Sequence, residues 1–263
     1  MRVVVCIKQV PATQDVVIDP ETKRLKRENV AAEMNPFDLY ALEEALRLVE
    51  AHGGEVLALS MGPSQAAASL REALCCGADR AILLSDRAFA GSDTWATSYA
   101  LARAIAHLGG VDLVLCGKQA VDGDTAQVGP GIAAHLDWPQ VTYVSAVRQV
   151  ADGALTVVRL HEEGHDVVRA ALPAVLTVVK DINVPRIPTL RRCREAHRMD
   201  IPVLTAADIG AEAACLGLEG SPTRVVKAAP PPPRRGKTVV IEGPCDRSAD
   251  RLVSALRSLS LIQ

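Results

Sequence analysis

The sequence is poor in aromatic residues, which make up 3% of its 263 positions, and it has no long uninterrupted apolar run. Apolar residues still account for 49% of the chain, so valine, leucine, isoleucine and alanine must build the core. A transmembrane helix needs about 18 or more consecutive apolar residues with few charges. The absence of such a run predicts that no segment of this chain inserts into a membrane.

Strong charge of either sign is also missing, since the formal net charge is −2 and no long basic tract occurs. Nucleic-acid-binding proteins carry a clustered positive surface, so we expect no nucleic-acid partner. The N-terminus, MRVVVCIKQV, lacks the successive sections of a signal peptide. Seven cysteines are scattered without CxxC spacing, which predicts neither disulfides nor zinc and suits a reducing cytoplasm.

Two nucleotide-binding motifs are absent as well. No GxGxxG follows the first predicted strand, and no GxxxxGK[ST] occurs, so neither an ordinary nicotinamide Rossmann site nor a P-loop is supported. The six histidines lie in separate segments without metal-ligand spacing, and we expect them on the solvated surface. The sequence therefore predicts no metal site and no side chain acting as acid, base or nucleophile.

Short aliphatic runs alternate with helical patterns over the first two thirds of the chain. The runs cover residues 2–7, 54–62, 80–85 and 111–117 and are typical of strands buried on both faces of a parallel sheet. The first helix is expected to have Asn35 as its N-cap, Pro36 at its first position and Gly53 at its end. This alternation predicts an α/β fold with a doubly wound, mostly parallel sheet.

The pattern changes after residue 140. Four β-rich runs separated by Gly or Asp turns predict antiparallel hairpins that extend the sheet, which completes a Rossmann-like adenine-nucleotide-binding domain over residues 1–182. Three prolines and a basic cluster predict that residues 183–203 leave the core. Residues 204–263 are predicted to form a C-terminal arm, with a polyproline linker at 228–236 and a terminal helix that packs on a partner subunit.

Ligands of open α/β sheets bind at the carboxyl ends of the strands, where helix N-termini point free N–H groups at anions. One stretch at such an end is DGDTAQVGP, residues 122–130. Gly123, Gly129 and the following Gly131 allow close backbone approach to a ligand, and Thr125 and Gln127 can hydrogen-bond a pyrophosphate or a ribose. The following helix supplies positive potential without a lysine. A capped loop that binds nothing is the alternative interpretation.

Several motifs in order give the chain a family resemblance: MNPFDLYALEEALRL, SMGPSQAAASLREALCCGADRAILL, LVLCGKQAVDGDTAQVGPGIAAHLDWPQVTYV and LPAVLTVVKDINVPRIPTL. From residue 1 to about 210 the sequence resembles the β (small) subunit of electron transfer flavoproteins. The resemblance implies pairing with an α subunit that carries the redox FAD, and a structural AMP in the β subunit of ordinary members. It places the nucleotide pocket on Cys6, Asn35, Pro36, Phe37, Asp38, Met61, Asp122, Gly123, Asp124, Thr125, Ala126, Gln127, Val128, Gly129, Pro130, Gly131, Ile132 and Ala133.

The wording of DGDTAQVGP, and of LLSDRAFAGSDTWATSYAL at 83–101, resembles the electron-bifurcating branch of that family. There a second FAD replaces AMP and reacts with NAD(H), which implies that Ala90, Gly91 and Thr94 lie beside the second flavin or the nicotinamide. One electron then goes to ferredoxin or flavodoxin and the other to the α-subunit FAD. An ordinary AMP-binding electron shuttle stays open, as does a free-standing adenine-nucleotide binder of the universal-stress type.

The stretch NVPRIPTLRR, residues 183–192, resembles the family's docking loop for acyl-CoA-type dehydrogenases. Leu190 corresponds to the anchoring leucine, and an apolar anchor ringed by charges suits a transient interface. The partners implied are such a dehydrogenase or a quinone-linked oxidoreductase. The family signature near 157–177 is imperfect, because Asp166 stands where Glu or Gln is usual.

Overall fold

The computed structural model describes residues 1–12, 32–226 and 238–262, and the chain forms two compact units, Met1–Val226 and Lys227–Gln263. The first unit contains a nine-stranded sheet with the order β11-β5-β4-β1-β6-β10-β7-β8-β9. Its parallel strands are β1 (Arg2–Cys6), β4 (Glu55–Met61), β5 (Arg80–Leu84), β6 (Leu113–Gly117), β7 (Gln140–Ala151), β10 (Ala174–Val178) and β11 (Val203–Leu204). A separate two-stranded ribbon joins β2 (Gln9–Pro11) to β3 (Ala32–Met34).

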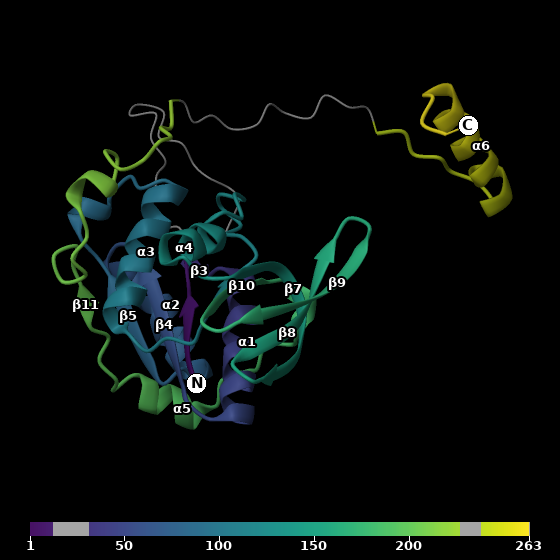
Figure 1. Cartoon of the computed structure of the whole chain (residues 1–263). Coiled ribbons are helices and arrows are strands. Elements are labelled where there is room, and N and C mark those ends of the chain that lie inside the picture. The colour runs from purple at the N-terminus through teal and green to yellow at the C-terminus, as the bar shows by residue number, and fades with distance from the viewer. Residues whose placement is uncertain (13–31, 227–237, 263) are drawn as a thin grey trace. The chain divides into compact units, whose positions relative to one another are not determined.

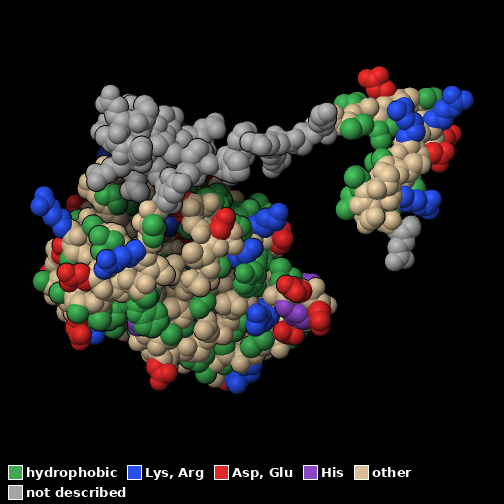
Figure 2. All heavy atoms as spheres, turned by 90° about the horizontal axis from the view of Figure 1, so that it is seen from above, with side chains coloured by type: hydrophobic (Ala, Val, Ile, Leu, Met, Phe, Trp, Pro, Cys, Tyr) green, Lys and Arg blue, Asp and Glu red, His purple; other side chains and the backbone are tan. Residues whose placement is uncertain are grey.

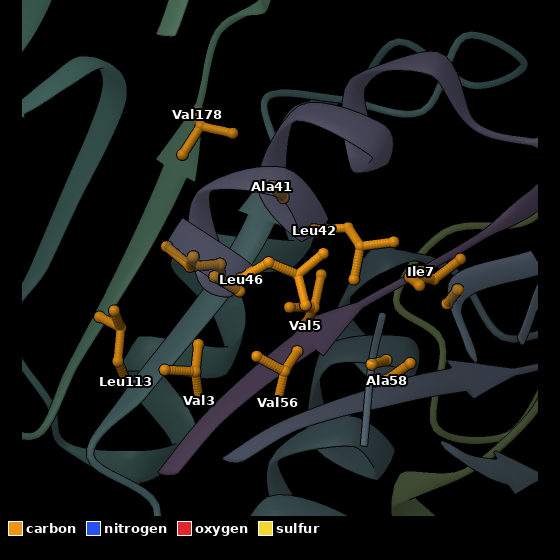
Figure 3. Packing of buried hydrophobic residues seen from close by; sticks show 14 of the residues in the cluster. Val3, Val5, Ile7, Ala41, Leu42, Leu46, Val56, Ala58, Leu113 and Val178 are labelled. Atoms are coloured by element: carbon orange, nitrogen blue, oxygen red, sulfur yellow. The ribbon is translucent and has the colours of Figure 1, made fainter. Parts of the chain in front are cut away.

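Helices cover both faces of this sheet (Figure 1). The first face packs against α1 (Pro36–His52), α2 (Ala67–Cys76) and α5 (Leu190–Ala196), and the second packs against α3 (Thr94–Leu108) and α4 (Val128–Leu136). Figure 3 shows the first core, in which Ala41, Leu42 and Leu46 of α1 lie over Val3 and Val5 of β1. The other face of β1 contributes Val4 and Cys6 to the second core, which confirms the predicted doubly wound α/β fold.

The predicted hairpins exist, but one of the four strands belongs elsewhere. Strand β7 forms antiparallel pairs with β8 (Ala154–His161), which pairs in turn with β9 (Gly164–Ala171) at the sheet edge. Strand β10, predicted as part of this hairpin series, instead lies parallel between β6 and β7. All five of its residues are buried, and such a strand requires neighbours on both sides as well as cover on both faces.

Residues 183–203 do not leave the core as predicted, because they cross the face that carries α1 and α2. Ala196 of α5 is fully buried there, and β11 then pairs with β5 at the far edge of the sheet. Ile209 and Leu216 enter the second core, so residues 204–226 also belong to the first unit, and the second unit begins at Lys227 rather than at the predicted 204. The polyproline linker predicted at 228–236 lies outside the described residues.

The second unit contains helix α6 (Cys245–Ser258). Leu252 and Val253 of this helix are exposed, as are Leu259 and Leu261 just beyond it. No residue of α6 is buried among the residues that the structure describes. An amphipathic helix of this kind has an apolar side for which its own unit supplies no cover.

Candidate functional site

The sheet reverses its winding direction between β1 and β6, which are hydrogen-bonded neighbours. Helix α1 follows β1 on one face, and α4 follows β6 on the other. In open α/β sheets, such a point forms a crevice at the carboxyl ends of the two strands. Here this point lies just beyond Cys6 and Cys116, which are paired in register.

Cys6 and Cys116, near the carboxyl ends of β1 and β6, are core residues. Both are buried on the face covered by α3 and α4. A hydrogen bond from the Cys116 thiol to Cys6, together with burial, raises the pKa of that thiol well above its usual range. Because the thiolate is the reactive form of cysteine, this shift makes Cys116 poorly reactive, and both buried cysteines serve packing.

A buried carboxyl group ties the two strand ends and α1 together. Asp38 is 5% exposed, and it accepts hydrogen bonds from the backbone N–H of Lys8 (2.8 Å), from Asn35 Nδ2 (2.9 Å) and from the Gly117 backbone. Asn35 does stand at the N-cap position of α1, but its side chain makes no capping bond. Its amide instead donates to the Gln119 carbonyl and accepts from the Val121 N–H, which fixes the loop after β6.

Burial raises the pKa of Asp38 to about 7, against the opposing effect of its three N–H donors. An aspartate in an unfolded chain has a pKa of about 3.9, so between these values the folded protein holds a proton that the unfolded chain has lost. The stability that this proton contributes is present in full below about pH 4 and is lost as the pH rises through about 7.

We therefore expect a pH-dependent difference between the wild type and Asp38→Asn, which cannot titrate. With rising pH between 4 and 7, the wild-type free energy of unfolding should fall relative to the variant by up to about 1.4 kcal/mol per pH unit. Urea unfolding at several pH values measures this difference. Parallel curves, or a relative rise in wild-type stability, would contradict the raised pKa.

The loop between β6 and α4 is held at two points and leaves its last amides free. Lys8 Nζ pairs with both oxygens of Asp122 (2.6 and 2.8 Å), and Gln119 Nε2 donates to Asp124 Oδ1 at 2.6 Å. Within the described residues, none of the backbone N–H groups from Thr125 to Gly129 has a hydrogen-bond acceptor. We call residues 125–129 the amide nest.

The backbone conformation of the amide nest is that of an anion-binding site. Ala126 is left-handed (φ 54°), whereas the following Gln127 is right-handed (φ −107°, ψ −16°). Successive residues of opposite hand turn their N–H groups toward one side, which creates a concave site for an anion. The N-terminus of α4 adds its dipole at the same place. The geometry thus suits a phosphate or diphosphate and needs no bound cation.

The three glycines expected to let a ligand approach have different roles in the structure. A Cβ on Gly129 would lie 2.5 Å from Thr177 Cγ2, and one on Gly131 would collide with Ser98. These two glycines therefore allow α4 to pack closely on β10 and α3. Of the three, only Gly123 has no atom of the described residues within 4 Å of its Cβ position.

The remaining predicted pocket residues of this region differ in where their side chains lie. Ile132 and Ala133 bury their side chains in the second core, and Pro130 lies in the first turn of α4. Pro36 and Phe37 begin α1, and Met61 ends β4 on the same edge of the sheet. The structure thus brings the predicted pocket residues to one edge, although several of their side chains point inward.

The loop after β5 adjoins this edge through a hydrogen bond from Thr94 Oγ1 to Gln127 Oε1 (3.3 Å). Asp93 caps α3 by accepting from the N–H groups of Trp95 and Ala96. The space beside Gly91 is filled by the chain itself, since a Cβ there would lie 2.6 Å from Leu218 Cγ. Ala90 stays exposed.

Other side chains at the edge were not singled out from the sequence as site residues. Lys8 and Gln119 orient the loop through their hydrogen bonds to Asp122 and Asp124. Both are polar residues that directly follow a buried strand, and this position in the sequence could have identified them. Thr177 and Tyr143 carried no such signal, because their positions depend on strand pairing. His135 also departs from expectation: its ring lies 4.5 Å from that of Trp95, and its Nε2 is buried without a partner.

Two further features complete the description. The described part of the chain holds no cluster of three His, Cys, Asp or Glu side chains suited to a metal ion. Among the described residues, no helix has the length and apolar character that a membrane crossing requires. Leu190, at the start of α5, is 87% exposed, and its neighbours Ile187 and Val184 are 90% and 79% exposed.

Comparison with known proteins identifies the family. A model of the electron transfer flavoprotein domain matches residues 22–209. An electron transfer flavoprotein subunit beta from Thermoanaerobacterium thermosaccharolyticum is 47% identical over 263 residues, which cover 100% of both chains. The caffeyl-CoA reductase-Etf complex subunit CarD of Acetobacterium woodii is 44% identical, again over 100% of both chains. Protein FixA of Sinorhizobium fredii is 48% identical over 92% of this chain and 87% of its own.

These matches span the motifs from which the resemblance was inferred and confirm it. They also remove the alternative of a free-standing universal-stress-type protein. The chain belongs to the electron transfer flavoprotein family, and its full-length similarity is to the beta subunits of that family.

Proposed function

We propose that this chain is the beta subunit of a heterodimeric electron transfer flavoprotein that binds a second FAD at the carboxyl edge of its sheet and receives electrons from NADH there. The single observation that supports this most is the amide nest, in which five consecutive N–H groups have no acceptor among the described residues. A dinucleotide presents a diphosphate that such a nest can bind.

The chain's own residues hold and orient the nucleotide. In this proposal the N–H groups of Thr125 to Gly129 bind the diphosphate, and Gln127 and Asp124 lie within reach of ribose hydroxyls. Asp38 and Asn35 keep the loop in place from below. When bound, the flavin supplies the redox chemistry: it takes two electrons as hydride from NADH and passes them on singly, one to ferredoxin or flavodoxin and one to the alpha-subunit FAD.

A structural AMP without NADH oxidation is the second candidate, and one observation favours it. The space beside Gly91, where the resemblance places a flavin or nicotinamide ring, is filled by Leu218 of the same chain. An AMP carries one phosphate and no flavin ring, so it needs the amide nest but no space beside Gly91. CarD is named as a subunit of a caffeyl-CoA reductase-Etf complex, which supports an electron-transfer complex with a reductase partner under either candidate.

Partner binding is proposed at two separate surfaces. The exposed side chains of Val184, Ile187 and Leu190 are suited to anchor an acyl-CoA-type dehydrogenase or a quinone-linked oxidoreductase. The apolar side of α6 is proposed to pack on the alpha subunit. Figure 2 shows acidic and basic side chains interspersed on the visible face of the first unit, without a large area of one sign.

Anaerobic titration with NADH distinguishes the two candidates. The purified heterodimer should lose flavin absorbance on addition of NADH, without any dehydrogenase present. NADPH at the same concentration controls for non-specific reduction. A heterodimer that keeps its absorbance with NADH but is reduced by an acyl-CoA dehydrogenase and its substrate would support the AMP-binding shuttle.

A further inference from the structure

A strained residue lies in β7, beside the carboxyl edge of the sheet where the nucleotide site is proposed. Tyr143 has a left-handed backbone (φ 58°), and it lies where the pairing of β7 with β10 shifts register between Leu176 and Val178. A bulky residue in this conformation is an outlier that persists only where its surroundings enforce it. Its N–H is satisfied by Thr177 Oγ1 at 3.1 Å, and Thr177 is buried. The structure thus contains a stabilised β-bulge, a feature that redirects a side chain.

The redirected ring lies under the ammonium group of Lys118. Lys118 Nζ is 5.3 Å from the ring centroid of Tyr143 and 5.8 Å from that of Phe37, the second residue of α1. Phe37 can come this close because Gly117 has no side chain: a Cβ there would lie 2.7 Å from the Phe37 Cβ. We call Lys118, Tyr143 and Phe37 the lysine cage.

The aromatic rings of the lysine cage contact the ammonium group of Lys118 but do not neutralise its charge. Within the described residues, Lys118 Nζ has neither a carboxylate nor a hydrogen-bond partner, whereas Lys8 on the same edge is neutralised by Asp122. Aromatic faces attract an ammonium group but carry no net charge. A lysine placed in this way keeps its full attraction for an anionic ligand.

Thr177 connects the lysine cage to the amide nest. Its hydroxyl accepts from the Tyr143 N–H, while its methyl group faces Gly129, the last residue of the nest. The backbone N–H of Lys118 donates to the Val178 carbonyl at 2.9 Å, which fixes the lysine to the same strand. The cage and the nest therefore share one wall at the carboxyl ends of β6 and β10.

From this arrangement we infer that Lys118 is a nucleotide-binding residue whose ammonium group binds the phosphate groups of the nucleotide held by the amide nest. The inference rests on the proposed function, because it assumes the nucleotide site. It adds a specific cation to a site that the sequence predicted to work without one.

Calorimetric binding of ADP and adenosine to the nucleotide-stripped heterodimer tests the inference. Lys118→Met should weaken ADP binding by about 10- to 100-fold, as expected for loss of a charged hydrogen bond, and leave adenosine binding unchanged. Lys118→Arg should restore part of the ADP affinity. Lys180→Met is the matched control, because Lys180 is exposed just beyond β10.

The outcomes separate this inference from the proposed function. Unchanged ADP affinity in Lys118→Met would overturn the inference alone, as would an equal loss for ADP and adenosine, which would indicate a structural role. A wild-type heterodimer that binds neither ligand would overturn the proposed nucleotide site and the inference with it.

Discussion

Replacement of Gly129 by alanine is expected to displace the start of α4 and to weaken nucleotide binding by about tenfold or more, because the amide nest moves with the helix. The added methyl group would lie 2.5 Å from the Thr177 methyl, inside a buried contact between α4 and β10. Overpacking of this kind costs about 1–3 kcal/mol of stability. Calorimetric titration with ADP and urea unfolding measure the two effects.

The structure offers both a control and a rescue for this variant. Gly123→Ala, in the same loop, adds a methyl group to open space and should change stability by less than about 0.5 kcal/mol. Thr177→Ser removes the colliding methyl group but keeps the hydroxyl that accepts from Tyr143. The double variant Gly129→Ala/Thr177→Ser should therefore regain most of the lost affinity. Failure of this rescue would mean that Gly129 acts in some way other than by close packing.

Loss of the Arg186 side chain should destabilise the protein by about 2–4 kcal/mol, since it leaves a buried carboxylate with less compensation. Arg186 Nε donates to Glu43 Oε2 at 2.7 Å and Nη1 donates to Glu50 Oε1 at 2.6 Å. The Glu43 side chain is only 5% exposed, and these hydrogen bonds with Arg186 and Arg47 outweigh burial and lower its pKa. In Arg186→Met, Glu43 loses the guanidinium but keeps its pair with Arg47 and the hydrogen bond from the backbone N–H of residue 186.

The same variant should loosen the segment that carries the proposed docking residues. Arg186 and Asn183 fasten this segment to α1, and Arg192 fastens its other end by donating to the Leu74 and Ala78 carbonyls. Hydrogen exchange of residues 183–190 should increase, and the apparent KM for the dehydrogenase partner should rise while reduction by NADH stays unchanged. Glu50→Gln is the control, because Glu50 is exposed and its pair should contribute less than about 1 kcal/mol. Equal destabilisation by both variants would contradict the special role of buried Glu43.

Local sequence signals predicted the elements of the fold well. Pro36 and Gly53 mark the two ends of α1, which spans Pro36–His52 in the structure. The aliphatic runs predicted as strands coincide with β1, β4, β5 and β6. These signals succeed because helix boundaries and strand burial depend on a few neighbouring residues.

The errors concern contacts between segments far apart in the sequence. The basic cluster of residues 183–203 suggested a solvated segment, yet Arg186 and Arg192 use their length to reach α1 and the end of α2. The sequence also could not show that β10 lies between β6 and β7, because a buried aliphatic run does not specify which strands pair with it. At the candidate site, the small and polar residues of 122–130 marked the stretch that contains the amide nest, and the family resemblance extended the predicted site to Ala133. The sequence could not reveal that Gly129 serves packing or that Tyr143 forms a bulge, because both depend on Thr177 of another strand.

The most direct test of the proposed function is the cofactor content of the purified heterodimer, measured by chromatography after acid release. If the free amides of residues 125–129 hold the diphosphate of a second FAD, the heterodimer should contain two FAD and no AMP. One FAD with one AMP would contradict the proposed bifurcating function, and one FAD without any adenine nucleotide at the second site would contradict the nucleotide site itself.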